Sequence, residues 1–221
     1  MSPRPTDPVL APVMASEQVV VDARGVTLPG ELTVPSRPTG LVIFAHGSDS
    51  SRHSPRNQYV AQVLDRAGLA TLLFDLLSPE EARDRRNVFD IPLLAERLTA
   101  AHEWAEQRDD LGGLTVGYFG ASTGGAAAVW SAGDASGVGA VVSRGGRVDL
   151  AGDRLGDVTA PTLLVVGALD TEVLRLNREA QQRLHCLNRL EIVADATHLF
   201  SEPGTLERVA ELARDWFRTH L

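Results

Sequence analysis

The sequence contains no lysine, so every basic side chain apart from histidine is an arginine. This absence excludes enzymes that hold pyridoxal phosphate through a lysine Schiff base and nucleoside triphosphatases that use a P-loop lysine. Cys186 is the only cysteine, which excludes an intramolecular disulfide and a metal site built from several cysteines. A lone cysteine is typical of a reducing compartment, so we expect a cytoplasmic protein.

Excess positive charge and long apolar runs are also missing. The net charge of −8 argues against a nucleic acid or an anionic membrane as a partner. The longest apolar runs have the length of a strand, so no segment is expected to span a membrane. Residues 1–16 contain four prolines and no apolar block, which predicts a flexible leader and no signal peptide. Residues 17–221 suffice for a single domain. Neither a cofactor nor an oligomeric state is indicated.

Short apolar runs alternate with helical patterns along residues 17–221. A hairpin is predicted over residues 18–34. Ser54 and Pro55 suit the cap and first position of the first helix. This alternation predicts an α/β domain with a mostly parallel sheet of about eight strands and helices on both faces. Beyond the hairpin, strands are predicted at 41–45, 69–74, 114–119, 139–142, 162–166 and 190–193, and helices at 54–67, 91–107, 123–132 and 206–217.

A small-x-Ser-x-small turn lies between the apolar run 114–119 and an alanine-rich helical pattern. In this turn Gly120 and Gly124 flank Ser122 and leave room for a strained backbone and for close packing of strand and helix. Such a turn raises the serine hydroxyl above the end of the sheet. It also places the backbone N–H of the next residue, Thr123, beside the reacting carbon. Ser122 is therefore the candidate nucleophile.

A serine hydroxyl needs a base to take its proton and an acid to orient that base. Among six histidines, His198 lies in the loop after the last predicted strand, from where it can reach back over the elbow. Asp170 follows the strand at 162–166, and the chain order Ser122, Asp170, His198 is that of the α/β-hydrolase fold. Asp195 is the alternative acid, because it lies only three residues from His198.

The loop after the strand at 41–45 is expected to supply the second donor for an oxyanion. Gly47 allows the backbone to turn inward, and the N–H of Ser48 is the natural donor. His46 is then interpreted as a residue that fixes this loop. Asp75 ends a neighbouring strand, where a structural or substrate-facing role is expected.

Four segments together resemble the α/β-hydrolases related to dienelactone hydrolase. The resemblance covers the chain after about residue 17, and it implies an α/β-hydrolase fold and ester hydrolysis through an acyl-enzyme. Dienelactone hydrolase itself uses a cysteine where this chain has Ser122, so its lactone substrate is not carried over. The four segments are Ala45-His46-Gly47-Ser48, Gly120-Ala121-Ser122-Thr123-Gly124, Gly167-Ala168-Leu169-Asp170 and Ala196-Thr197-His198.

Two further segments, residues 50–57 and 142–147, resemble a bacterial subgroup of small hydrolases. Some members of that subgroup are fused to a phosphoribosyltransferase domain, for which this chain is too short. The connection from Val142 to Pro161 is also too short for the helical cap of larger hydrolases. We therefore expect an open site for a small or accessible ester-type substrate.

Arginines gather near the predicted site. Arg144 follows a strand, and Arg52 and Arg56 flank the start of the first helix. Guanidinium groups bind carboxylates and phosphates through two hydrogen bonds, so these residues are candidates to bind an acidic group of the substrate. The alternative is that they form structural salt bridges with the many acidic side chains.

Other functions stay open at this point. Acyl transfer to an acceptor other than water uses the same groups as hydrolysis. A binding protein on the same fold, with slow or no turnover, would need neither Ser122 nor its partners. Metal-dependent hydrolysis lacks a compact ligand set, because His53 and Asp49 are isolated.

Overall fold

The computed structural model describes residues 14–134 and 137–221. Residues 1–13, which make up most of the expected leader, lie outside the described residues. The first strand, β1 (Met14–Ala23), begins before residue 17, so residues 14–16 belong to it. This strand pairs with β2 (Val26–Pro35) along its whole length.

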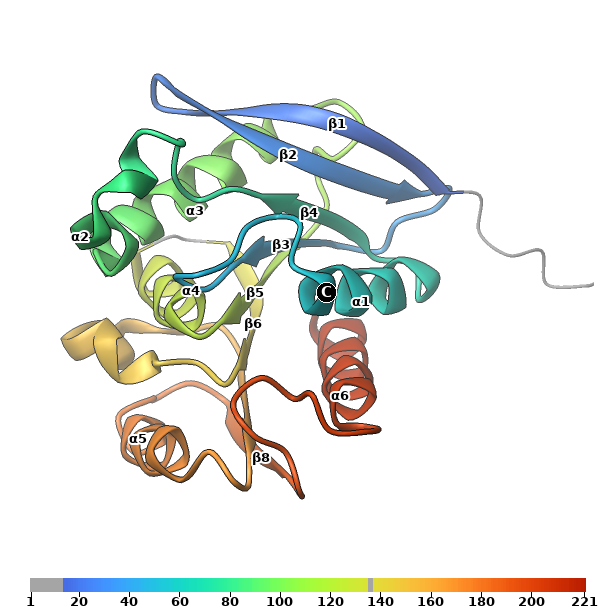
Figure 1. The fold of residues 1–221 in the computed structure, drawn as a ribbon. Coiled ribbons are helices and arrows are strands. Elements are labelled where there is room, and N and C mark those ends of the chain that lie inside the picture. The colour runs from blue at the N-terminus through green and yellow to red at the C-terminus, as the bar shows by residue number, and fades with distance from the viewer. Residues whose placement is uncertain (1–13, 135–136) are drawn as a thin grey trace, which may run out of the picture.

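The described strands form one eight-stranded sheet in the order β1-β2-β4-β3-β5-β6-β7-β8. The β1–β2 hairpin is antiparallel and adds to the edge of β4 in antiparallel fashion, whereas β3 to β8 are all parallel. Figure 1 shows the hairpin along one edge of the sheet. The remaining strands are β3 (Leu41–Ala45), β4 (Ala70–Phe74), β5 (Val116–Ala121), β6 (Val138–Arg144), β7 (Thr162–Gly167) and β8 (Asn188–Val193).

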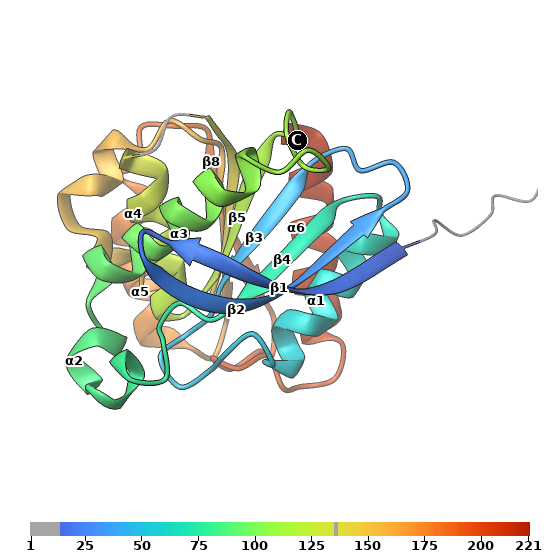
Figure 2. The ribbon, with the colours of Figure 1, turned by 90° about the horizontal axis from the view of Figure 1, so that it is seen from above.

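Helices cover both faces of the sheet, as the alternating pattern predicts (Figures 1 and 2). On one face lie α1 and α6, and on the other lie α3, α4 and α5. Ser54 caps α1 by accepting a hydrogen bond from the Asn57 N–H, and Pro55 is the first helical residue. The bounds are α1 (Pro55–Arg66), α2 (Arg85–Val88), α3 (Ile91–Glu106), α4 (Thr123–Asp134), α5 (Thr171–Gln181) and α6 (Thr205–His220), with 3-10 helices at Glu81–Arg83 and Val148–Asp157.

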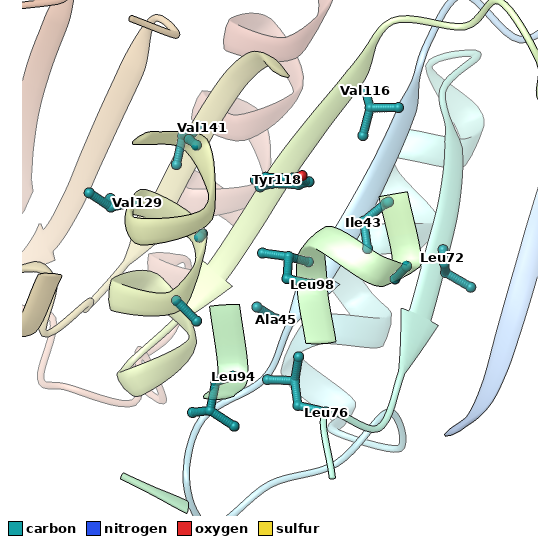
Figure 3. Packing of buried hydrophobic residues seen from close by; sticks show 14 of the residues in the cluster. Ile43, Ala45, Leu72, Leu76, Leu94, Leu98, Val116, Tyr118, Val129 and Val141 are labelled. Atoms are coloured by element: carbon teal, nitrogen blue, oxygen red, sulfur yellow. The ribbon is translucent and has the colours of Figure 1, made fainter. Parts of the chain in front are cut away.

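The parallel strands are apolar without interruption because both of their faces are buried. In β3, Leu41, Ile43 and Ala45 pack beneath α3 and α4. The intervening residues, Val42 and Phe44, pack beneath α1 and α6. Figure 3 shows the first of these layers, in which leucines of α3 lie over β3 and β5. Because side chains alternate between the two faces of a strand, β3 contributes to the hydrophobic core on each side of the sheet.

The connection from β6 to β7 holds the 3-10 helix at 148–157, which packs against α4. Within the described residues there is thus no cap domain over the sheet, as expected from the length of this connection. Residues 81–88, for which the sequence analysis predicts no helix, contain two short helices. Asp84 caps the second of these by accepting from the Arg86 N–H over 3.0 Å. Local polar caps form these turns, so apolar periodicity does not reveal them.

No described helix combines the length and the apolar character needed to cross a bilayer.

Candidate active site

Ser122 is the single residue between β5 and α4, and its φ is 52°. This left-handed conformation is strained for a residue with a side chain. Backbone hydrogen bonds hold it: the Ser122 N–H donates to the Arg144 carbonyl (3.3 Å), and the Ser122 carbonyl accepts from Gly125 (3.0 Å) and Arg147 (3.0 Å). The turn is therefore fixed by β6 and by the residues that follow β6.

Glycines surround this turn because backbone segments meet there. A Cβ on Gly120 would overlap the Gly124 carbonyl oxygen, and a Cβ on Gly124 would overlap the Ala45 carbonyl oxygen. A Cβ on Gly47 would lie 3.1 Å from the Ser122 Cβ. The end of β3, the loop after it and the elbow thus pack without intervening side chains.

His198 and Asp170 form a close pair. His198 Nδ1 lies 2.6 Å from Asp170 Oδ2, and the two side chains are 39% and 14% exposed. The contact to Asp170 occupies Nδ1 and leaves Nε2 as the ring nitrogen available to another group. Asp195, the alternative acid, is exposed in a turn with a φ of 58°. The structure thus pairs His198 with Asp170.

The loop that carries His198 is anchored on both sides. The Leu169 N–H donates to the Ala196 carbonyl over 3.0 Å, which ties the loop to the end of β7. Glu202 accepts from the Thr197 N–H (3.0 Å) and from the Thr197 hydroxyl (2.6 Å). These contacts hold the residues next to His198 in place.

His46 fixes the loop after β3, in agreement with its interpretation from the sequence. Its Nε2 accepts from the Leu76 N–H over 3.1 Å, so Nε2 carries no proton. Its Nδ1 therefore donates to the Gly47 carbonyl over 2.9 Å. Burial lowers the pKa of His46 below its usual value, which favours the neutral ring that this pattern requires.

The two candidate oxyanion donors, Ser48 and Thr123, each follow a residue of the contact between Gly47 and Ser122. Thr123 is the first residue of α4, so its N–H has no acceptor within the helix. Ser48 follows Gly47, which packs against Ser122. Both donors line the space beside the elbow.

Arg144 is a buried cation. Its side chain donates from Nη2 to Asn57 Oδ1 (3.2 Å), and its guanidinium carbon lies 6.0 Å from the centre of the Phe200 ring. No carboxylate among the described residues lies within salt-bridge distance of it. Burial lowers the pKa of Arg144 to about 10, and the nearby charge of Arg56 acts in the same direction. Arg144 is nevertheless protonated at neutral pH.

The other arginines near the site differ in their partners. The guanidinium and the backbone N–H of Arg52 both bind Asp75, so this residue fits the structural alternative. Arg147 pairs with Asp149 at 2.9 Å. Arg56 is half-buried and lines the same cavity as Arg144. The structure therefore brings Arg144 and Arg56 to the site and ties Arg52 to Asp75.

Ser122, His198, Arg144 and Arg56 line one cavity of about 170 Å³, and we call it the serine pocket. Its walls come from the β3 loop, the start of α1, the elbow, the end of β6 and the loop after β8. Its lining includes Gly47, Ser48, Arg56, Ser122, Arg144, His198 and Leu199.

Two neighbours of the site were not singled out from the sequence. Asn57 is buried in α1 and orients Arg144. Gly145 has a φ of 53°, and a Cβ there would lie 3.5 Å from the His198 ring. Both residues fall inside the two segments that resemble the small-hydrolase subgroup, which is the signal that marks them. No group of three metal-ligating side chains is found in the part of the chain that the structure describes.

No protein-family model matches the chain. Over 216 residues it is 58% identical to two proteins of Mycobacterium tuberculosis, from strains CDC 1551 and H37Rv, each named a putative phosphoribosyl transferase. The match takes in 97% of this chain and 49% of those proteins. The chain thus spans about half the length of these relatives.

Solved structures match over nearly the whole chain. Dienelactone hydrolase from Anabaena variabilis is 52% identical with a TM-score of 0.92, and the match covers 94% of this chain and 99% of that one. Est1E from Butyrivibrio proteoclasticus is 17% identical with a TM-score of 0.78 and coverages of 92% and 98%, and it shares the fold. The chain therefore belongs to the dienelactone-hydrolase-related family of α/β-hydrolases.

Proposed function

We propose that this hydrolase is a serine enzyme that cleaves a small carboxylic ester, lactone or thioester through an acyl-enzyme. The proposal rests above all on the 2.6 Å contact between Asp170 and His198, because His198 lines the same cavity as the strained Ser122. A nucleophile, a base and an orienting acid are the groups that acyl transfer requires.

The first step is the attack of Ser122 on the acyl carbon. His198 Nε2 takes the hydroxyl proton as Ser122 Oγ bonds to that carbon, and Asp170 stabilises the resulting imidazolium. The N–H groups of Ser48 and Thr123 donate to the negative oxygen of the tetrahedral intermediate. Breakage of the bond to the leaving alcohol then returns the proton from His198 to that alcohol.

The second step regenerates the enzyme. His198 takes a proton from water, whose oxygen bonds to the acyl carbon, and the same two N–H groups bind the second oxyanion. Breakage of the ester bond to Ser122 releases the acid, and Ser122 Oγ recovers its proton from His198. With an alcohol or amine in place of water, the same groups would perform acyl transfer.

An acidic group on the substrate is the second element of the proposal. Arg144 is a buried cation with no carboxylate partner among the described residues, and it shares the serine pocket with Arg56. A buried unpaired charge is costly, and a bound carboxylate or phosphate would compensate it. This favours an anionic ester over a neutral one.

Labelling with a fluorophosphonate tests the nucleophile. We expect wild-type protein to be labelled covalently at Ser122, detected by mass spectrometry of the peptide, and Ser122→Ala to stay unlabelled. Ser131→Ala is the matched control, because Ser131 is a buried serine of α4 outside the serine pocket. Absence of labelling in folded wild type would favour a binding protein on the same fold.

A further inference from the structure

A second cavity adjoins the serine pocket, and we call it the apolar pocket. It shares Gly47, Ser48 and Ser50 with the serine pocket, and it has a volume of about 190 Å³. Its other walls come from the residues after β4, the 79–88 segment and α3. These walls include Leu76, Leu77, Pro79, Ala82, Val88 and Leu94, and Thr123 at the start of α4 also lines the pocket.

The chemistry of the apolar pocket favours a hydrocarbon group. Its two titratable side chains already have partners within the protein. Asp75 binds Arg52, and His46 forms hydrogen bonds with Leu76 and Gly47. No free charge is therefore offered to a ligand. A cavity of about 150 Å³ holds a benzene molecule, so this pocket has room for about six carbon atoms.

The apolar pocket lies beside the position of the acyl carbon. Ser48 and Thr123, the proposed oxyanion donors, both line it, and Thr123 directly follows Ser122. A carbonyl oxygen bound by these two N–H groups therefore places the acyl carbon at the junction of the two pockets. One substituent of that carbon then faces each pocket.

Proton transfer decides which substituent faces which pocket. The leaving alcohol must take its proton from His198, so it has to lie on the His198 side. His198 lines the serine pocket together with Arg144 and Arg56, and it is not part of the apolar pocket. The remaining substituent of the acyl carbon is the acyl chain.

We propose that the apolar pocket is the acyl subsite and takes a compact apolar acyl group of about six carbon atoms. It follows that the acidic group bound by Arg144 belongs to the leaving alcohol. The substrate class is thus an ester between an apolar acid and an alcohol that carries a carboxylate or a phosphate. This inference rests on the proposed serine-hydrolase function.

Two isomeric esters and one exposed alanine test the subsite. Ala82 is exposed at the rim of the apolar pocket, so Ala82→Trp fills the pocket from outside without disturbing the core. We expect this variant to lower kcat/KM for ethyl hexanoate by about 10-fold or more and to change that for hexyl acetate by less than about 2-fold. Arg83→Trp, at the exposed neighbouring position outside the pocket, is the matched control and should affect neither ester.

Each other outcome has a definite meaning. A selective loss of kcat/KM for hexyl acetate would show that the apolar pocket binds the leaving alcohol and not the acyl chain. An equal loss for both esters, or no loss for either, would overturn the assignment of the apolar pocket as the acyl subsite. Leu94→Ala enlarges the pocket from α3 and should shift the best acyl chain to a longer one; an unchanged optimum would also contradict the subsite. If wild type cleaves neither ester and Ser122 is not labelled, the proposed function itself fails.

Discussion

Arg144 Nη2 donates a hydrogen bond to Asn57 Oδ1 over 3.2 Å, which joins two side chains 87 positions apart in the sequence. Both side chains are buried, and Asn57 carries no charge. An amide oxygen orients a guanidinium but does not neutralise it. The positive charge of Arg144 therefore stays available to a substrate in the serine pocket.

We predict that Arg144→Gln removes the preference for anionic esters. The ratio of kcat/KM for an ester with a carboxylate on its alcohol side to that for its neutral analogue should fall about 10- to 100-fold. This range corresponds to the loss of about 1.5–3 kcal/mol from a hydrogen bond to a charged group. Steady-state kinetics with both esters provide the measurement.

Arg147→Gln is the matched control for Arg144. Arg147 lies three residues later and pairs with Asp149, so its loss should leave the ratio unchanged. If Arg144→Gln slows both esters equally while the fold is retained, Arg144 has a structural role and binds no anionic group.

Replacement of Asp170 should separate the two candidate acids. Asp170→Asn keeps the size of the side chain but no longer fixes the tautomer of His198, so we expect kcat to fall by about 10³- to 10⁴-fold. Asp195→Asn should retain nearly full activity, because Asp195 is exposed and His198 already pairs with Asp170. Circular dichroism checks that both variants are folded, and the reverse ranking would assign the acid to Asp195.

Asp65 provides a pH-dependent contribution to stability. It is buried in α1 and accepts from the Thr71 hydroxyl over 2.7 Å, and burial raises its pKa to about 7. Because its pKa is higher in the folded than in the unfolded chain, its contribution is fully present below about pH 4. It is then lost as the pH rises through about 7.

Asp65→Asn should therefore be more stable than wild type at pH 8. The amide still accepts from Thr71 but never ionises, and the gain is at most about 4 kcal/mol from a shift of about three pKa units. Urea unfolding of both proteins at pH 4 and pH 8 measures this difference. Asp195→Asn, an exposed control, should show no such change, and an equal difference at both pH values would contradict the assignment.

Much of the architecture was predictable because apolar runs, helix caps and glycines mark its elements locally in the sequence. Val42 and Phe44 sit in an unbroken apolar run, which is the pattern of a strand covered on both faces. Ser54 and Pro55 mark the start of α1 through capping alone. The glycines around Ser122 indicate a turn in which backbone segments touch, and the structure shows why each lacks a side chain.

Other features depend on contacts between distant segments. The sequence predicts the same role for Arg52 and Arg144. The fold separates them, because Asp75 lies beside Arg52 and Asn57 lies beside Arg144. The position of Gly145 against the His198 ring likewise needs β6 and the loop after β8 to be placed together. Neither relationship leaves a local pattern.

The sequence by itself determined the order of strands and helices, the elbow at Ser122 and the candidates His198 and Asp170. These depend on periodicity, on glycine positions and on the order of residues along the chain, all of which can be read directly from the sequence. Only the tertiary structure decided that Asp170 pairs with His198, that no acidic side chain in the described part of the chain pairs with Arg144, and that an apolar pocket adjoins Thr123. Distances between side chains far apart in sequence arise only when the sheet brings its strand ends to one edge.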